Sequence, residues 1–213
     1  MVTWFYLTVL VISVIMTGSI LVKNRKVDNA FILFGVLLTV NCAGQYMLSV
    51  SETVESAVWA NKIMYVGGSY LPFVVFLVVT RLCNIKVNRY FKWFLMGYAT
   101  LVFALVMTIG HTDWYYKSVE LVQEDGFSYG PLRILYPVMM VMYSVMLLFF
   151  IGYAVKKRKE IPTQTVVTMS FLCAAVSLTY IVERVIGTKV SYLPVGFLIG
   201  MILLMRYFDR INM

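Results

Sequence analysis

The chain has 213 residues, of which 61% are hydrophobic and only 13% are charged, and its mean hydropathy is +0.84. One soluble core of this size cannot bury so much apolar surface, so the composition excludes an ordinary soluble domain and indicates an integral membrane protein. The net charge of +8 would suit a nucleic-acid partner, but its distribution along the chain indicates membrane orientation instead. We therefore expect the lipid bilayer as a partner and no nucleic acid.

Seven apolar stretches predict seven membrane spans, at about 3–22, 30–50, 58–83, 93–110, 134–154, 166–186 and 192–208. No basic segment and no small-residue cleavage site occur at the N-terminus, so 3–22 is expected to be a retained first span rather than a signal peptide. The prediction is a single all-α domain over 1–213, an integral membrane bundle of seven transmembrane helices.

Basic residues fall in alternate loops. Thirteen of the 18 lie on one predicted side with only three acids, Asp28, Glu160 and Asp209, and the other five lie on the opposite side with seven acids. The positive-inside rule then places the N-terminus outside the cell and the C-terminus in the cytoplasm of a multi-pass plasma membrane protein. The thirteen are Lys23, Arg25, Lys26, Arg81, Lys86, Arg89, Lys92, Lys156, Lys157, Arg158, Lys159, Arg206 and Arg210.

The third stretch carries polar residues in its outer half. Lys62, Tyr65, Ser69 and Pro72 are spaced by three or four, so they share one helix face. Because a polar group facing lipid is costly, this stripe should face other helices or a water-filled cavity. For Lys62, snorkelling to the outer headgroups is an equally good interpretation. The neighbouring Gly67-Gly68 predicts close helix packing.

No catalytic or metal-binding motif is visible. The chain has one histidine, His111, and its cysteines, Cys42, Cys83 and Cys173, form no Cys-x-x-Cys pair and are expected to be buried apolar groups. A retinal protein would need a lysine within 192–208, which has none. We expect no enzymatic activity in this chain, no cofactor and no metal.

Polar side chains gather in the outer halves of the spans, whereas the inner halves of the first, third, fifth and seventh spans are almost wholly apolar. This asymmetry favours a ligand pocket open to the outside over a path across the membrane, because a transporter places its site near the midplane. Alternatively, these groups bond to one another and only hold the bundle together. The candidate ligand-binding residues are Asn41, Gln45, Trp59, Lys62, Tyr65, His111, Tyr136, Tyr180, Glu183 and Arg184.

Three further expectations concern single positions. If Lys62 and Glu183 face one another, they are expected to form an ion pair. The Gly196-x-x-x-Gly200 spacing predicts a close helix contact or dimerisation. An aromatic belt at the interface is the first assignment for Trp4, Trp59, Trp114 and Tyr115.

The order of these features resembles a known family, the seven-transmembrane N-terminal sensor region found in front of many bacterial histidine kinases and diguanylate cyclases. The resemblance covers nearly the whole chain and rests on short motifs. These are Ala57-x-Trp59-x-x-Lys62-x-x-Tyr65-x-Gly67 leading to Pro72, then Gly110-His111, then Tyr129-Gly130-Pro131 with Tyr136 soon after, and finally Arg206-Tyr207-Phe208-Asp209.

The resemblance implies a receptor of a two-component system. A ligand of unknown identity would bind the outer half of the bundle and bias the last span, which would relay the signal to a cytoplasmic kinase or cyclase domain. That output domain would lie beyond Met213, so the chain is expected to be a sensor fragment or a stand-alone version, and a homodimer. A small-solute transporter or permease is the alternative, although no internal repeat supports it. An assembly partner without a ligand is a third possibility.

Overall fold

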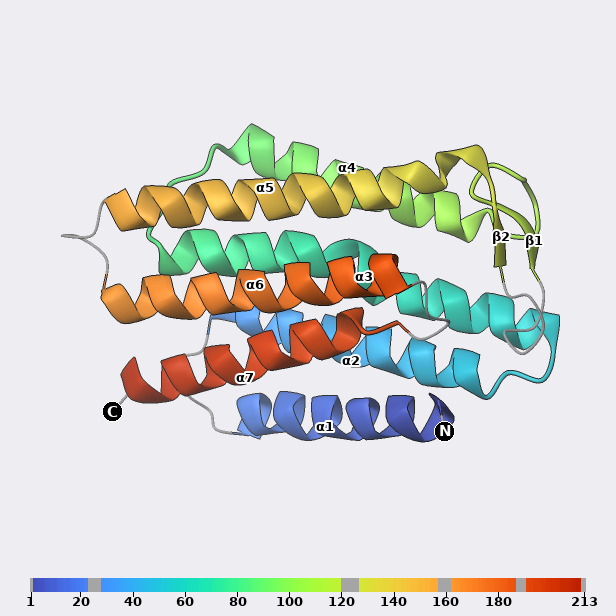
Figure 1. The fold of residues 1–213 in the computed structure, drawn as a ribbon, viewed down its shortest axis with the longest axis horizontal. Coiled ribbons are helices and arrows are strands. Elements are labelled where there is room, and N and C mark those ends of the chain that lie inside the picture. Colours follow the sequence, from blue (N-terminus) through green and yellow to red (C-terminus); the bar gives the residue numbers. More distant parts are fainter. Residues whose placement is uncertain (1, 23–27, 120–126, 157–161, 187–190, 212–213) are drawn as a thin grey trace.

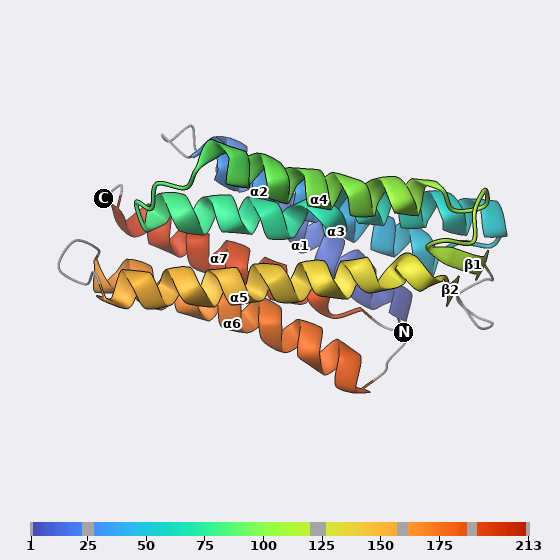
Figure 2. The same ribbon diagram turned by 90° about the horizontal axis from the view of Figure 1, so that it is seen from above.

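Seven α-helices lie side by side along the long axis of the molecule in the computed structural model, which describes residues 2–22, 28–119, 127–156, 162–186 and 191–211 (Figure 1). Successive helices run in opposite directions, and the view from above shows the same bundle (Figure 2). The predicted all-α seven-helix architecture is confirmed. The helices are α1 (Val2–Val22), α2 (Asn29–Ser49), α3 (Val54–Leu82), α4 (Arg89–Met107), α5 (Leu135–Lys156), α6 (Thr163–Ile186) and α7 (Leu193–Ile211).

A small antiparallel hairpin joins α4 to α5, in the segment between the predicted spans 93–110 and 134–154. Its strands are β1 (Tyr116–Val119) and β2 (Phe127–Tyr129), and the 3₁₀ turn η1 (Pro131–Ile134) leads into α5. The acidic residues Glu120, Glu124 and Asp125 lie outside the described residues. We call this end of the bundle the hairpin end and the opposite end the basic end.

Six of the helices are long and apolar enough to cross a membrane, and α7 contains the shorter apolar stretch Leu193–Phe208. Large apolar side chains on the outside of the bundle are well exposed, as on α5, where Val145 and Phe149 are 60% and 69% exposed. Such faces suit contact with lipid rather than with water.

Polar caps set where the helices begin, and this explains two differences from the predicted spans. Helix α3 begins four residues before Val58, because Thr53 and Ser56 form a reciprocal capping box ahead of the apolar run. Helix α4 begins at Arg89, where the side chain of Asn88 accepts a hydrogen bond of 2.9 Å from the amide of Tyr90. The apolar run predicts which residues lie in the bilayer, whereas the capping residue determines where the helix begins.

Helix α3 is the most buried of the candidate spans and packs against α2, α4 and α5. Glycines allow its close approach to α2: a Cβ on Gly44 would overlap the backbone of Met64, and one on Gly67 would overlap the carbonyl of Leu37. Close packing was therefore predicted correctly for Gly67. Helix α3 also bends midway along its length (Figure 1), as expected for a helix with an internal proline, Pro72.

Helix α7 packs closely against neighbouring helices along its length. A Cβ on Gly196 or Gly200 would overlap side chains of α6, so the predicted close contact exists and lies within the chain. Toward the basic end, the hydroxyl of Tyr207 lies 2.6 Å from that of Thr165 on α6, and the ring of Phe208 lies 5.0 Å from that of Phe31 on α2.

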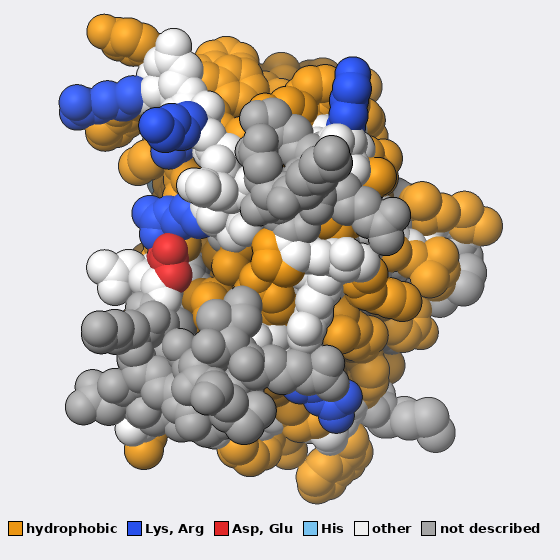
Figure 3. Space-filling model, turned by 90° about the vertical axis from the view of Figure 1, so that its left-hand side faces the viewer, with side chains coloured by type: hydrophobic (Ala, Val, Ile, Leu, Met, Phe, Trp, Pro, Cys, Tyr) orange, Lys and Arg blue, Asp and Glu red, His pale blue; other side chains and the backbone are white. Residues whose placement is uncertain are grey.

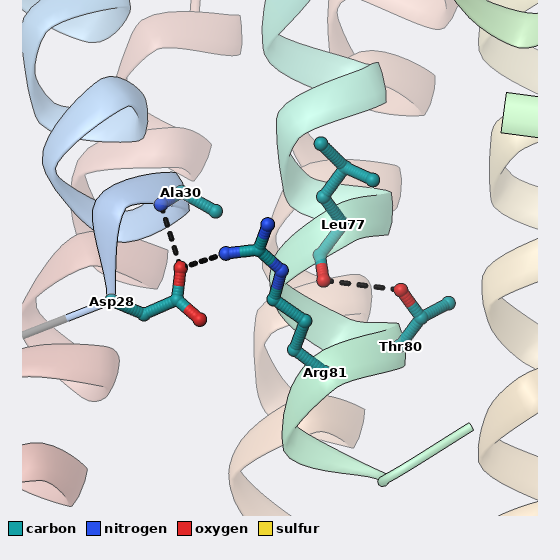
Figure 4. Close-up of polar contacts among 5 residues, drawn as sticks. All are labelled: Asp28, Ala30, Leu77, Thr80 and Arg81. Carbon is teal, nitrogen blue, oxygen red and sulfur yellow. Dashed lines mark hydrogen bonds and ion pairs between the residues drawn. The ribbon is translucent and has the colours of Figure 1, made fainter. Parts of the chain in front are cut away.

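The basic end carries exposed lysines and arginines, and Figure 3 shows them spread over this face with an acidic side chain beside one of them. In the close-up of Figure 4, Asp28 accepts a hydrogen bond of 2.7 Å from the amide of Ala30 and forms an ion pair with Arg81. One carboxylate thus caps α2 and ties it to the end of α3. Lys23, Arg25, Lys26 and residues 157–159 lie outside the described residues.

Candidate functional site

Three tyrosines from separate segments meet at the hairpin end, and we call them the tyrosine cluster: Tyr65 of α3, Tyr115 before β1, and Tyr136 of α5. The hydroxyl of Tyr115 donates to that of Tyr65 across 3.3 Å. The ring of Tyr65 is edge-on to both others, with centroid distances of 6.0 Å to Tyr115 and 5.5 Å to Tyr136. The cluster places hydroxyl groups among aromatic faces where α3, α5 and the hairpin join.

The hairpin covers the cluster with further aromatic rings. The ring of Tyr116 lies 5.2 Å from that of Phe127 and 5.3 Å from that of Tyr129. The guanidinium of Arg133 then stacks on Tyr129 at 3.2 Å from the ring centroid. Val58 and Tyr65 of α3 pack against this group of rings, so the hairpin lies over one face of α3.

A glycine closes the hairpin against the segment that precedes it. A Cβ on Gly130 would overlap the carbonyl oxygens of Asp113 and Trp114, so no other residue allows this approach. The amide of Gly130 donates to the carbonyl of Tyr115 across 2.9 Å, and the amide of Leu132 donates to that of Trp114 across 3.0 Å. This contact explains the glycine of the Tyr129-Gly130-Pro131 motif.

Burial keeps the hairpin phenols neutral. Tyr115 and Tyr116 are only 1% and 4% exposed. Loss of hydration raises the pKa of both phenols well above the usual tyrosine value, and the neighbouring tyrosines add to the effect. These groups therefore act as hydrogen-bond donors and acceptors throughout the physiological pH range.

Asn41 links α2 to the site. Its side-chain amide donates across 2.8 Å to the carbonyl of Met64, one residue before Tyr65. The same amide nitrogen and the hydroxyl of Tyr136 lie 3.4 Å and 3.7 Å from the position that a Cβ on Gly68 would take. Asn41, Tyr65 and Tyr136 are thus the candidate residues that the structure brings together, around residues 64–68 of α3.

Lys62 and Glu183 do not form the ion pair that the sequence suggested. The ammonium of Lys62 lies over the ring of Trp59, 5.2 Å from its centroid, which is a cation–π contact with a residue on its own helix. Glu183 is engaged elsewhere, and among the described side chains no salt bridge joins the two. The predicted pairing is therefore wrong, because each charge contacts another partner.

Glu183 instead anchors the start of α7. Its carboxylate accepts a hydrogen bond of 2.8 Å from the hydroxyl of Ser191 and a longer one, 3.4 Å, from the amide of Leu193. The amide of Ser191 in turn donates to the hydroxyl of Tyr6 on α1 across 2.8 Å. A carboxylate at a helix N-terminus is electrostatically favourable, so Glu183 holds α7 to both α6 and α1.

The remaining candidates are more scattered. Gln45 is buried on α2 and Tyr180 is partly buried on α6, whereas Trp59 and His111 are exposed. The side chain of Arg184 lies outside the described part of the structure. Within the described residues, no group of three or more His, Cys, Asp or Glu side chains could hold a metal ion.

Tyr115 was assigned wrongly to the interfacial belt. It is buried by the hairpin, whereas Trp4, Trp59 and Trp114 are indeed exposed, at 73%, 58% and 58%. The signal that could have identified it is the Tyr115-Tyr116 pair followed by Phe127 and Tyr129, two short aromatic segments before a Gly-Pro turn, which is typical of a hairpin.

The comparisons with known proteins place the chain in a family. A family model described as the N-terminal 7TM region of histidine kinase matches residues 5–210. No curated protein and no solved structure matches the chain.

Proposed function

The chain belongs to the family of N-terminal 7TM regions of histidine kinases, and on that premise we propose that it binds a ligand at the hairpin end and relays binding through α7 to a cytoplasmic output domain. The family is a membrane sensory region rather than a catalytic domain, and the chain is a multi-pass plasma membrane protein. In addition to ligand binding and relay, we propose that the chain forms a homodimer and that its N-terminus lies outside the cell.

The convergence of α2, α3, α5 and the hairpin on the tyrosine cluster carries this proposal. Neutral hydroxyl groups, an amide and aromatic faces from segments far apart in sequence are held together there. A ligand that bound them better in one arrangement than in another would shift the relative positions of these segments.

Packing along α2 offers a route from this site to the end of α7. Asn41 and Gly44 contact α3 near the cluster, and further along the same helix the rings of Phe31 and Phe34 contact those of Phe208 and Phe197 on α7. A shift of α3 against α2 would thus reach the segment through which α7 leaves the bundle.

The basic end supports the proposed orientation. Lysines and arginines predominate there, and such an excess marks the cytoplasmic side of a membrane protein. The C-terminal end of α7 lies at this end (Figure 1), in the position from which an output domain would continue.

A fusion tests the sensory role. Residues 1–213 would be joined in frame to the cytoplasmic part of a well-behaved histidine kinase, reconstituted into vesicles, and assayed for autophosphorylation with culture-medium and lipid extracts as probes. We expect at least one extract to change the rate, and Phe208→Ala to reduce that response while the protein stays folded. An unchanged rate with every extract, together with a wild-type basal rate for Phe208→Ala, would count against the proposal.

A further inference from the structure

Two buried side-chain atoms on α3 have no hydrogen-bond partner in the described part of the chain. They are the amide nitrogen of Asn61 and the hydroxyl of Ser69, on residues that are 1% and 0% exposed. Buried polar groups are almost always bonded, and an unbonded one destabilises a fold. Two such groups, eight positions apart, are open to a partner from outside the chain.

The two orphan groups flank a member of the tyrosine cluster. Asn61, Tyr65 and Ser69 are each one turn apart, so they form a slowly winding line along α3, which we call the α3 ladder. At 1.5 Å per residue, the ladder spans about 12 Å along the helix axis. Tyr65 in its middle contributes a ring face and a hydroxyl that already bonds Tyr115.

Polar groups from three helices lie around Gly68, the residue before Ser69. Gly68 has no side chain, and the amide of Asn41 and the hydroxyl of Tyr136 lie beside the space that a Cβ would fill. Pro72 has no N–H, so it cannot donate the usual helical hydrogen bond to the carbonyl of Gly68. Ser69 therefore follows directly after a position where amide, hydroxyl and carbonyl functions lie close together.

The ladder contains no charged side chain. The nearest cation in sequence, Lys62, has its ammonium over Trp59, and the carboxylate of Glu183 is bonded at the start of α7. Recognition here would therefore depend on neutral hydrogen bonds and aromatic contact, and an ionic ligand would pay a large desolvation cost without a counter-charge.

Building on the proposed sensory function, we propose that the α3 ladder is the binding subsite for an uncharged, elongated amphipathic molecule. This molecule would offer a hydrogen-bond acceptor to Asn61 and a hydroxyl, carbonyl or amide group to Ser69, about 12 Å apart. Its apolar middle would lie against the ring of Tyr65.

Cysteine accessibility tests whether uncharged molecules reach the ladder. In a background where Cys42, Cys83 and Cys173 are replaced by alanine, Asn61→Cys and Ser69→Cys would be treated in vesicles with neutral methyl methanethiosulfonate. The sulfonatoethyl and trimethylammonioethyl analogues would supply charged probes. The controls are Ala99→Cys, fully buried on α4, and His111→Cys, which is exposed.

We expect the neutral reagent to modify both ladder cysteines about tenfold faster than Ala99→Cys, because a closed core reacts only when it opens. When each rate is divided by the rate of the same reagent at His111→Cys, the charged reagents should modify the ladder cysteines about tenfold more slowly than the neutral reagent. Rates equal to that of Ala99→Cys would show a closed ladder and overturn the proposal. Equal rates for charged and neutral reagents would show an open aqueous cavity and overturn its preference for uncharged molecules.

Thermal unfolding gives a second test that needs no cysteine. Removing an unbonded group should leave the melting temperature of the unliganded protein unchanged or raised, so we expect this for Ser69→Ala. Thr165→Val is the control, because it leaves the buried hydroxyl of Tyr207 unpaired and should lower the melting temperature by about 2–4 °C. An equal fall for Ser69→Ala would show that its hydroxyl is bonded within the fold.

Neither experiment requires a signalling output. A closed or bonded ladder would remove this inference and leave the sensory proposal standing. A reactive ladder in a chain whose kinase fusion never responds would instead indicate a binding site without a relay.

Discussion

The hydroxyl of Tyr115 donates a hydrogen bond to the hydroxyl of Tyr65, 3.3 Å away, and this bond ties the hairpin to α3. The two residues are fifty positions apart, and one belongs to a membrane helix while the other belongs to a loop segment. Through this bond the only strands in the described residues are fixed to the most buried candidate span. Loss of this bond would therefore weaken the attachment of the hairpin to α3.

Tyr115→Phe removes this bond without removing the ring. We expect a loss of about 0.5–1.5 kcal/mol in stability, because the packing stays and one hydrogen bond goes. Backbone amides at 115–119 and 127–130 should exchange faster with deuterium, since the hairpin is held less firmly. Tyr90→Phe, at a tyrosine that is 82% exposed, is the matched control and should change neither quantity. Unchanged exchange in Tyr115→Phe would show that the bond does not hold the hairpin.

Gly67→Ala should separate α2 from α3. The new methyl group would overlap the backbone of α2, and such overpacking costs about 1–3 kcal/mol or more. Gly97→Ala is the control, because nothing lies within 4 Å of its Cβ position and alanine is the better helix former. We expect Gly67→Ala to lower the melting temperature in detergent, and Gly97→Ala to leave it unchanged or raise it. The opposite order would contradict the observed packing.

Asp28 both caps α2 and pairs with Arg81, and different substitutions can distinguish these two roles. Asp28→Ala loses both the cap of α2 and the ion pair with Arg81, and the cap alone stabilises by about 1 kcal/mol. Asp28→Asn keeps a capping oxygen and loses only a partly exposed ion pair, which contributes about 0–1 kcal/mol. We expect chemical unfolding to rank wild type, Asp28→Asn and Asp28→Ala in falling stability, with Arg81→Ala close to Asp28→Asn. If Asp28→Asn and Asp28→Ala were equally destabilised, the cap would make no contribution to stability.

Alkaline pH should loosen the hairpin. Burial raises the folded-state pKa of Tyr116 above its unfolded value of about 10. The folded state therefore binds more protons, so the stabilisation is fully present below pH 10 and is lost as the pH rises above it. Denaturant unfolding at stepped pH should show this decline, and Tyr116→Phe should make it shallower, whereas Tyr90→Phe should not. An identical decline in Tyr116→Phe would exclude this phenol as its source.

Several features of the protein follow from the sequence alone. Apolar runs of span length predict the helices, because a membrane segment must satisfy its backbone internally and a helix does so within itself. Glycines such as Gly67 and Gly196 predict close helix contacts, because only they remove the Cβ. Three of the four residues of the predicted polar stripe, Tyr65, Ser69 and Pro72, are partly or fully buried. The fourth, Lys62, instead has its ammonium over the exposed ring of Trp59.

Tertiary structure alone decided which polar groups meet. Sequence could not show that Glu183 bonds the start of α7 rather than Lys62, because the pairing depends on how α6 and α7 are connected in space. Nor could it show that Tyr115 is buried, since an aromatic residue after a span suits an interface equally well until a hairpin folds over it. The orphan groups of Asn61 and Ser69 appear only when every neighbour is in place, because an unmet hydrogen bond is a property of the surroundings and not of the residue.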